Sequence, residues 1–260
     1  MGKSTCYIRR YVCDNGIEYK TKFYVKEDIS EVKSYRQKNA IIRRYEKGAA
    51  EAAHEMGRLL NCNFKTGKDY YLGLDYSDEG LAALVERMGG IDDEQALVLA
   101  AKKEWENYLR RVKRRCAKLN IDVRAVDIVS ISDPETGEVV RIHHHAVVNA
   151  EAVEIFKACW KAGQVWAKKL RSKHGVDLQD LANYMIKQAA RVGADKRYTH
   201  TRNLVKAIAH PPVQSRNPDA ELRAPIGCEM IWRSEYTKGR AQHIRYYRPP
   251  GHEAEEKGTE

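Results

Sequence analysis

The segment 141–149, with the sequence RIHHHAVVN, is the part of the chain that most restricts its fold. Its β-branched and apolar residues predict a strand, in which successive side chains point to opposite faces of a sheet. His144 then faces the core, whereas His143 and His145 project side by side from the other face. Two imidazoles held in this way are suited to binding a divalent metal ion. A chance histidine cluster on an exposed strand, or a hydrogen-bonded polar network, is the alternative interpretation.

A metal site on this strand needs a third ligand with an oxygen or nitrogen donor. Asp133 is the first candidate, because it ends the preceding predicted strand and lies near His143 if the two strands pair antiparallel. Asp75 and Asp127 are the alternatives. Two histidines and one carboxylate fit Mn²⁺ or Mg²⁺ acting on phosphate oxygens, as well as other first-row metals.

The order of the predicted elements favours an α+β fold with a central antiparallel sheet flanked by helices. A turn predicted at 134–137 makes the strands on either side of it antiparallel. The strands of this sheet are expected at 69–76, 123–131, 138–149 and 164–170, and the helices at 81–88, 92–119, 151–162 and 177–191, with Asp177 as the N-cap of the last.

The two ends of the chain read differently from this central part. An Asn15-Gly16 step predicts a hairpin between strands at 5–13 and 18–25, a charged helix follows at 30–60, and a last hairpin is expected within 228–247. We therefore divide the chain into an N-terminal hairpin and basic helix, a catalytic domain, a C-terminal extension and a disordered acidic tail, at 1–57, 58–212, 213–248 and 249–260.

The composition indicates an anionic partner. The formal net charge is +10, from 46 basic and 36 acidic residues, and a basic protein of this kind most often binds nucleic acid. The six cysteines form no C-x-x-C pair, which argues against a zinc module or a disulfide framework. There is no apolar run of the ~20 residues that a membrane span needs and no signal-like N-terminus, so we expect a reducing, cytoplasmic location.

A tyrosine and a lysine share one face of the helix predicted at 177–191. Tyr184 and Lys187 are three residues apart, so both project from the same side of the helix. A tyrosine at this spacing from apolar residues is most often only half-buried. The pair nevertheless suits attack on a phosphate, because an ammonium group and a metal ion would stabilise the charge that develops.

Two basic clusters are candidates for contact with a phosphate backbone. The first is dense, at one end of the helix predicted at 92–119, although such residues can also form an ordinary solvated face. The second mixes basic and aromatic side chains, a combination found in sites for single strands. The first cluster comprises Arg110, Arg111, Lys113, Arg114, Arg115 and Lys118, and the second comprises Tyr198, Arg202 and Asn203.

Together these residues resemble the rolling-circle replication initiators of the HUH endonuclease superfamily, above all the replication-associated proteins of phages, plasmids and integrative elements of Gram-positive bacteria. The resemblance covers 58–212 and rests mainly on HHHAVVN followed by a helix with Tyr-x-x-Lys. It also includes the segments LNCNF, DYYLGLDYS, CWKAG, LANYMIK and RNL.

The resemblance implies a role for each candidate residue. His143 and His145 would be metal ligands on a central strand, Tyr184 the nucleophile, and Lys187 its assistant. Asp133 falls near the position of the third ligand, which is more often Glu in the family. Two departures stand out: Gln188 replaces a frequent Glu, and the helix holds a single tyrosine, which argues against a two-tyrosine mechanism.

The function that the resemblance implies is site-specific cleavage and religation of single-stranded DNA, which initiates rolling-circle replication through a 5′-phosphotyrosine intermediate. Its partners would be single-stranded or hairpin origin DNA and a helicase and polymerase of the host, since the chain has no Walker-type loop; no membrane partner is expected. The alternatives are a non-cleaving DNA-binding regulator on the same scaffold, a conjugative relaxase or transposase, and a basic RNA-binding protein.

Overall fold

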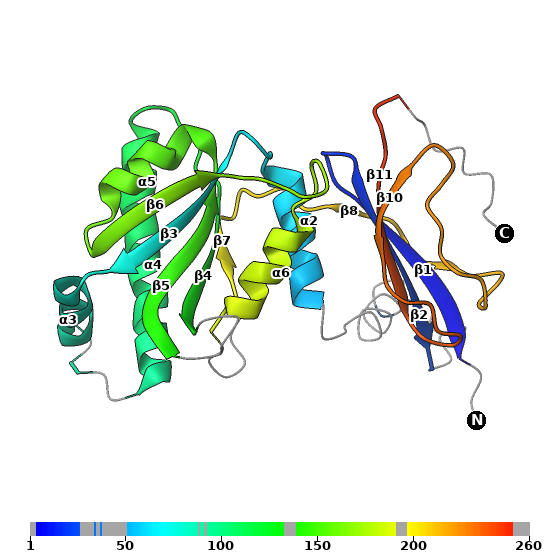
Figure 1. Ribbon diagram of the computed structural model, residues 1–260, viewed down its shortest axis with the longest axis horizontal. Helices are drawn as coiled ribbons and strands as arrows, with labels where there is room; N and C mark the ends of the chain where they lie inside the picture. Colours follow the sequence, from blue (N-terminus) through cyan, green and yellow to red (C-terminus); the bar gives the residue numbers. More distant parts are fainter. Residues whose placement is uncertain are drawn as a thin grey trace. The chain divides into compact units, whose positions relative to one another are not determined.

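The computed structural model describes residues 4–26, 34, 37, 51–87, 89–90, 93–132, 139–190 and 197–251. The chain divides into two compact units. The terminal unit combines Met1–Cys62 with Lys206–Glu260, and the central unit is Asn63–Val205. Both units contain antiparallel sheets and helices are present, which confirms an α+β protein (Figure 1).

The terminal unit is built on the hairpin that the sequence predicts. Strands β1 (Thr5–Val12) and β2 (Ile17–Val25) pair antiparallel, and Gly16 in the turn has a φ of 83°, a conformation that favours glycine. The unit also contains helix α2 (Glu51–Asn63) and strands β8 (Ile208–Ala209), β9 (Val213–Gln214), β10 (Glu229–Arg233) and β11 (Gln242–Tyr247). Strand β11 pairs with β2, and β8 and β9 both pair with β1.

This sheet joins the two ends of the chain, which the sequence assigned to separate segments, 1–57 and 213–248. A buried carboxylate strengthens the junction: Glu18 on β2 accepts hydrogen bonds from Tyr246 (2.7 Å) and Arg248 (2.5 Å). Burial alone would raise the pKa of Glu18, but these two donors and Arg10 lower it below its ordinary value. The terminal strands therefore form one structural unit.

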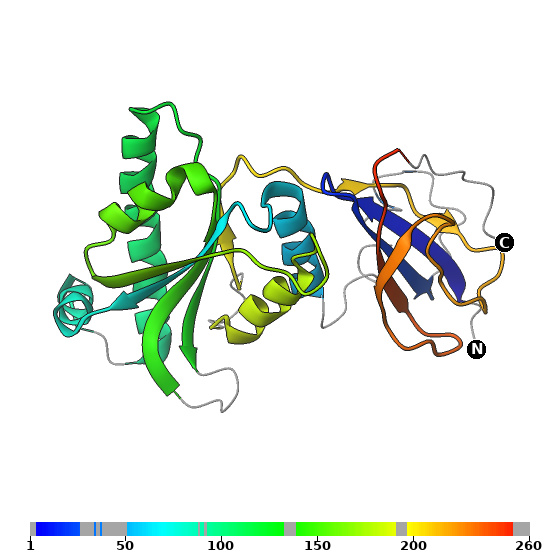
Figure 2. The ribbon, with the colours of Figure 1, turned by 45° about the horizontal axis from the view of Figure 1, so that its top comes forward.

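The central unit is a five-stranded antiparallel sheet in the order β6-β3-β5-β4-β7 (Figures 1 and 2). Its histidine strand β5 lies in the middle. The strands are β3 (Tyr70–Tyr76), β4 (Ala125–Ser132), β5 (Val139–Val148), β6 (Gly163–Lys169) and β7 (Thr199–His200).

One face of this sheet packs against helices α4 (Glu94–Ala117) and α5 (Val153–Cys159), the latter preceded by the short 3-10 helix η1 (Ala150–Ala152). Asp93 caps α4 by accepting a hydrogen bond of 2.7 Å from the Ala96 amide. Helix α3 (Asp78–Arg87) follows β3. The core between sheet and helices includes Leu72, Leu74, Trp105, Tyr108, Val112, Ala146, Val148 and Phe156.

Helix α6 (Gln179–Gln188) lies on the other face of the sheet, and its C-terminal end is tied to β4. The Ala190 amide donates to the Val129 carbonyl at 2.8 Å, and Ala189 forms a bridge with Ser130. The N-cap of α6 is Leu178 rather than Asp177, although the Asp177 carboxylate accepts a hydrogen bond of 3.1 Å from the Gln179 amide.

Some predicted elements fall outside the described residues. They are the turn at 134–137, most of the helix expected at 30–60 and most of the tail at 249–260. Among the helices that the structure does describe, none is both long enough and apolar enough to cross a bilayer.

Candidate functional site

The two faces of β5 are those that the alternation of its sequence predicts. Ile142, His144 and Ala146 are buried against the helices. His143 and His145 lie on the opposite face, the one that α6 covers in part; we call it the site face. Residues directly opposite one another in antiparallel strands share a face. The register therefore also places on it Asp75, opposite His143, and Gly73, opposite His145.

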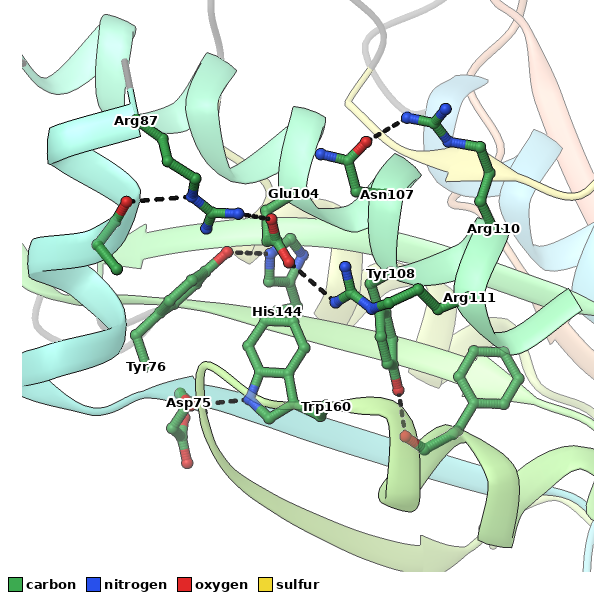
Figure 3. A network of polar contacts seen from close by, with 12 residues as sticks. Asp75, Tyr76, Arg87, Glu104, Asn107, Tyr108, Arg110, Arg111, His144 and Trp160 are labelled. Carbon is green, nitrogen blue, oxygen red and sulfur yellow. Dashed lines mark hydrogen bonds and ion pairs between the residues drawn. The ribbon is translucent and has the colours of Figure 1, made fainter. Parts of the chain in front are cut away.

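A buried polar network on the other face holds the histidine strand in place (Figure 3). The Tyr76 hydroxyl lies 3.1 Å from Nε2 of His144, and the Asp127 carboxylate lies 3.1 Å from its Nδ1. The Trp105 ring stacks on His144 with centroids 5.7 Å apart. Burial raises the pKa of Asp127 to about 6 even though His144 acts to lower it. Asp127 therefore belongs to this network and, contrary to one expectation, cannot be a ligand on the site face.

The imidazoles of His143 and His145 face one another on the site face. Their Nε2 atoms are 3.1 Å apart, and the ring planes are almost perpendicular, at 86°. Nδ1 of His143 lies 2.8 Å from the Arg141 carbonyl oxygen, which can only accept, so this nitrogen carries the proton. In neutral His143 the lone pair is then on Nε2 and points toward His145.

His145 is held in its neutral form. Its side chain is buried, and burial, with a further contribution from His143, lowers its pKa to about 3. Nδ1 of His145 and Oε1 of Gln188 are both buried, and the Gln188 side chain acts in the opposite direction, to raise this pKa. In the tautomer of His145 with the proton on Nδ1, the lone pair of His145 lies on Nε2 and points toward Nε2 of His143.

This arrangement fits a divalent cation. Two nitrogen atoms 3.1 Å apart can both lie at a normal metal–nitrogen distance of about 2.0–2.1 Å from one point between them. Metal-binding histidines usually donate their other N–H to a carbonyl or carboxylate, as His143 does to Arg141. The described residues contain no group of three His, Cys, Asp or Glu side chains placed to hold a metal. Asp133 lies outside the described residues, and Asp75 is the carboxylate opposite His143.

Tyr184 on α6 reaches the histidine pair. Its ring centroid is 6.3 Å from that of His145, and its side chain is 45% exposed. The link between α6 and β4 fixes this approach, because Ser130, which bridges to Ala189, is also opposite His143. Lys187 is exposed at the next turn of the helix. The structure therefore brings His143, His145 and Tyr184 together, and it places Lys187 on the same helix as Tyr184.

Two aromatic residues that the sequence did not single out for a role complete the site. Tyr71 stacks on His145, with centroids 5.4 Å apart and planes at 16°, and Trp166 on β6 packs edge-on against Tyr71 at 5.5 Å. Burial, and then the neighbouring Tyr184, raise the pKa of Tyr71, so its hydroxyl stays protonated. The alternation of β3 indicated the face of Tyr71, but no local signal indicated its distance from His145.

The basic cluster lies on α4 and so on the opposite side of the sheet from Tyr184. An open depression of about 520 Å³ there is lined by Asn107, Arg110, Arg111, Lys113 and Arg114. Arg111 forms an ion pair with the buried carboxylate of Glu104, which also pairs with Arg87. The nitrogen–oxygen distance is 3.0 Å in both pairs (Figure 3). Arg110, Lys113, Arg114, Arg115 and Lys118 are exposed. These side chains therefore cannot contact a group bound at the histidine pair, which lies on the other side of the sheet.

The second cluster is at the far edge of the sheet. His200 on β7 pairs with Val126 and so lies on the site face, and the Tyr198 ring lies 6.2 Å from it. Arg202 is exposed just beyond the strand, whereas the Asn203 amide donates to Asp122 at 2.8 Å and has a structural role.

Comparison with known proteins adds no assignment: no family model matches the sequence, and neither a curated protein nor a solved structure is significantly similar to it. The function must therefore be argued from the geometry of the site.

Proposed function

We propose that the protein is a metal-dependent, tyrosine-based single-strand DNA endonuclease and ligase of the HUH type, which initiates rolling-circle replication. The observation that supports this most strongly is the convergence on one face of two imidazole rings and one accessible phenol. His145 has its Nε2 3.1 Å from that of His143 and its ring 6.3 Å from that of Tyr184.

His143 and His145 would hold the cation, together with an oxygen ligand for which Asp133 and Asp75 are the candidates. A divalent ion such as Mn²⁺ or Mg²⁺ held there would supply Lewis-acid polarisation of the scissile phosphate. The surrounding residues hold both imidazoles in fixed orientation, since Tyr71 stacks on one ring and the Arg141 carbonyl accepts a hydrogen bond from the other.

The Tyr184 hydroxyl would then act as the nucleophile. Its oxygen forms a bond to phosphorus as the bond from phosphorus to the 3′ oxygen breaks, and its proton is released to solvent. The leaving oxygen takes up a proton and becomes a free 3′ hydroxyl, which a polymerase can extend. Lys187 supplies positive charge as the negative charge develops. Because one ester replaces another, attack by a 3′ hydroxyl reverses the step and reseals the strand.

The cations on α4 suit a different task. Four exposed side chains would bind the phosphates of DNA on the side of the sheet opposite the scissile phosphate: Arg110, Lys113, Arg114 and Arg115. Such contacts add affinity that depends on salt but not on sequence, so the recognised origin must be read elsewhere.

A labelled-oligonucleotide assay tests the proposal. A pool of random single-stranded DNA with a 3′ label is incubated with the protein and Mn²⁺, and SDS-resistant labelled protein is scored. The 3′ label is needed because the fragment that stays on the tyrosine retains its 3′ end. The native chain should form the adduct, and Tyr184→Phe and the His143→Ala/His145→Ala variant should not. DNA binding without any adduct would instead favour the non-cleaving regulator.

A further inference from the structure

Trp166 is an exposed aromatic side chain at the edge of the candidate site. It lies on the edge strand β6 and is 36% exposed, whereas Trp105 and Trp160 in the same unit are buried. An indole left in contact with water at the rim of a site forgoes burial of a large apolar surface.

The ring of Trp166 rests directly on the backbone of β3. A Cβ atom added to Gly73 would lie only 2.1–2.3 Å from three atoms of the indole, so the absence of a side chain at this position is what allows the ring to lie there. Tyr71 packs against it edge-on, and the His145 ring is 6.2 Å away. These contacts fix the orientation of the Trp166 ring, which we call the platform, before any ligand binds.

Positive charge accompanies the ring. Lys168, two residues along β6 and on the same face, places its Nζ over the indole ring, 5.3 Å from the centroid, so a base that stacks on this ring has to displace the ammonium group. Its side chain is exposed. An aromatic plane with an adjacent ammonium group is the combination that binds an unpaired nucleotide, the plane stacking on the base and the charge contacting the phosphate.

We propose that Trp166 stacks on an unpaired base next to the phosphate held at the histidine pair, and that Lys168 contacts the backbone of the same nucleotide. The inference rests on the proposed function and names the side of the site from which the strand enters. A duplex cannot use this platform, because its bases already stack on one another. The site is thus selective for single strands without reading a base edge.

The test is binding without metal, measured by fluorescence anisotropy with labelled single-stranded and duplex DNA of the same sequence. Trp166→Ala should bind single strands about 5- to 140-fold more weakly, which corresponds to ~1–3 kcal/mol at 1.4 kcal/mol per tenfold, and duplex unchanged. Trp166→Phe should keep most of the affinity. Trp232→Ala is the matched control, because Trp232 is 41% exposed in the terminal unit, and it should bind like the native chain.

Equal single-strand affinity of the native and Trp166→Ala proteins would overturn the inference, as would an equal loss in Trp166→Ala and Trp232→Ala. If Trp166→Ala does not fold, the native and Trp166→Phe proteins are compared by tryptophan fluorescence. Single-stranded DNA should then quench the native protein and not the variant, and equal quenching would refute the stacking. The adduct assay tests the nuclease function separately from the stacking. If an adduct forms and Trp166→Ala binds single strands as the native protein does, the stacking is rejected and the nuclease function is not. A loss of binding in Trp166→Ala without any adduct would reject only the nuclease.

Discussion

His145 should make the central unit sensitive to acid. Its pKa is lowered to about 3 in the folded protein, mainly by burial, against about 6.5 in an unfolded chain. Below pH 6.5, His145 therefore binds a proton in the unfolded chain but not in the folded chain, so the free energy of unfolding decreases as the pH falls. At 1.36 kcal/mol per pH unit, the loss is about 2 kcal/mol between pH 7 and pH 5 and about 4 kcal/mol between pH 7 and pH 3.

The perturbation that isolates this contribution is His145→Phe, which keeps an aromatic ring beside Tyr71 and removes the titration. The raised pKa of Asp127 acts in the opposite direction over the same range, but it is present in both proteins and cancels in the difference. Urea unfolding at pH 7 and pH 5 with a chelator present gives the two free energies. Tryptophan fluorescence is a suitable probe in a Trp232→Phe background, because the other three tryptophans lie in the central unit.

The expected result is that the native protein loses about 2 kcal/mol more than the variant between the two pH values. If both lose the same amount, His145 is not a buried neutral imidazole. The argument that its Nε2 lone pair is available to a cation at neutral pH would then be wrong.

Three further substitutions test other parts of the structure. Gly73→Ala should displace the Trp166 ring, lower stability by about 1–3 kcal/mol in thermal unfolding, and weaken single-strand binding as Trp166→Ala does; unchanged binding would contradict the packing described. Asp127→Ala should cost about 1–3 kcal/mol in urea unfolding, because it leaves Nδ1 of His144 buried without a partner; a cost below about 0.5 kcal/mol would argue against the network. Glu18→Gln should cost about 1.5–3 kcal/mol at neutral pH, through weaker hydrogen bonds in the terminal sheet. Because the pKa of Glu18 is lowered despite its burial, its contribution is present above pH 4.3 and is lost in more acidic solution, so the two proteins should converge there; a constant difference would refute this.

The sequence predicted most where a pattern is local. The alternation in 141–149 placed His144 in the core and the other two histidines on the opposite face, and the structure confirms both. The Asn15-Gly16 step likewise identified the first hairpin. In each case neighbouring residues alone determine the geometry, since a strand has a period of two and a tight turn needs a particular backbone conformation.

The sequence could not predict contacts that depend on pairing between distant strands. Whether Tyr71 and Trp166 lie beside His145 depends on the registers of β3 with β5 and with β6, and a shift of one residue would move them to the other face. The charge pattern of α4 showed a basic end but not which face of the sheet the helix covers. The pairing of β11 with β2 joins residues more than 200 positions apart, for which a linear pattern has no signal.

Mass spectrometry of the covalent adduct tests the central claim most directly. After reaction with single-stranded DNA and Mn²⁺, the protein is digested with nuclease and trypsin. Residues 174–187 form a tryptic peptide in which Tyr184 is the only tyrosine, while Tyr71 lies in the separate peptide 69–87. We expect nucleotide mass on 174–187 alone. Nucleotide on 69–87, or on neither peptide in a sample that holds an adduct, would contradict the assignment of Tyr184 as the nucleophile.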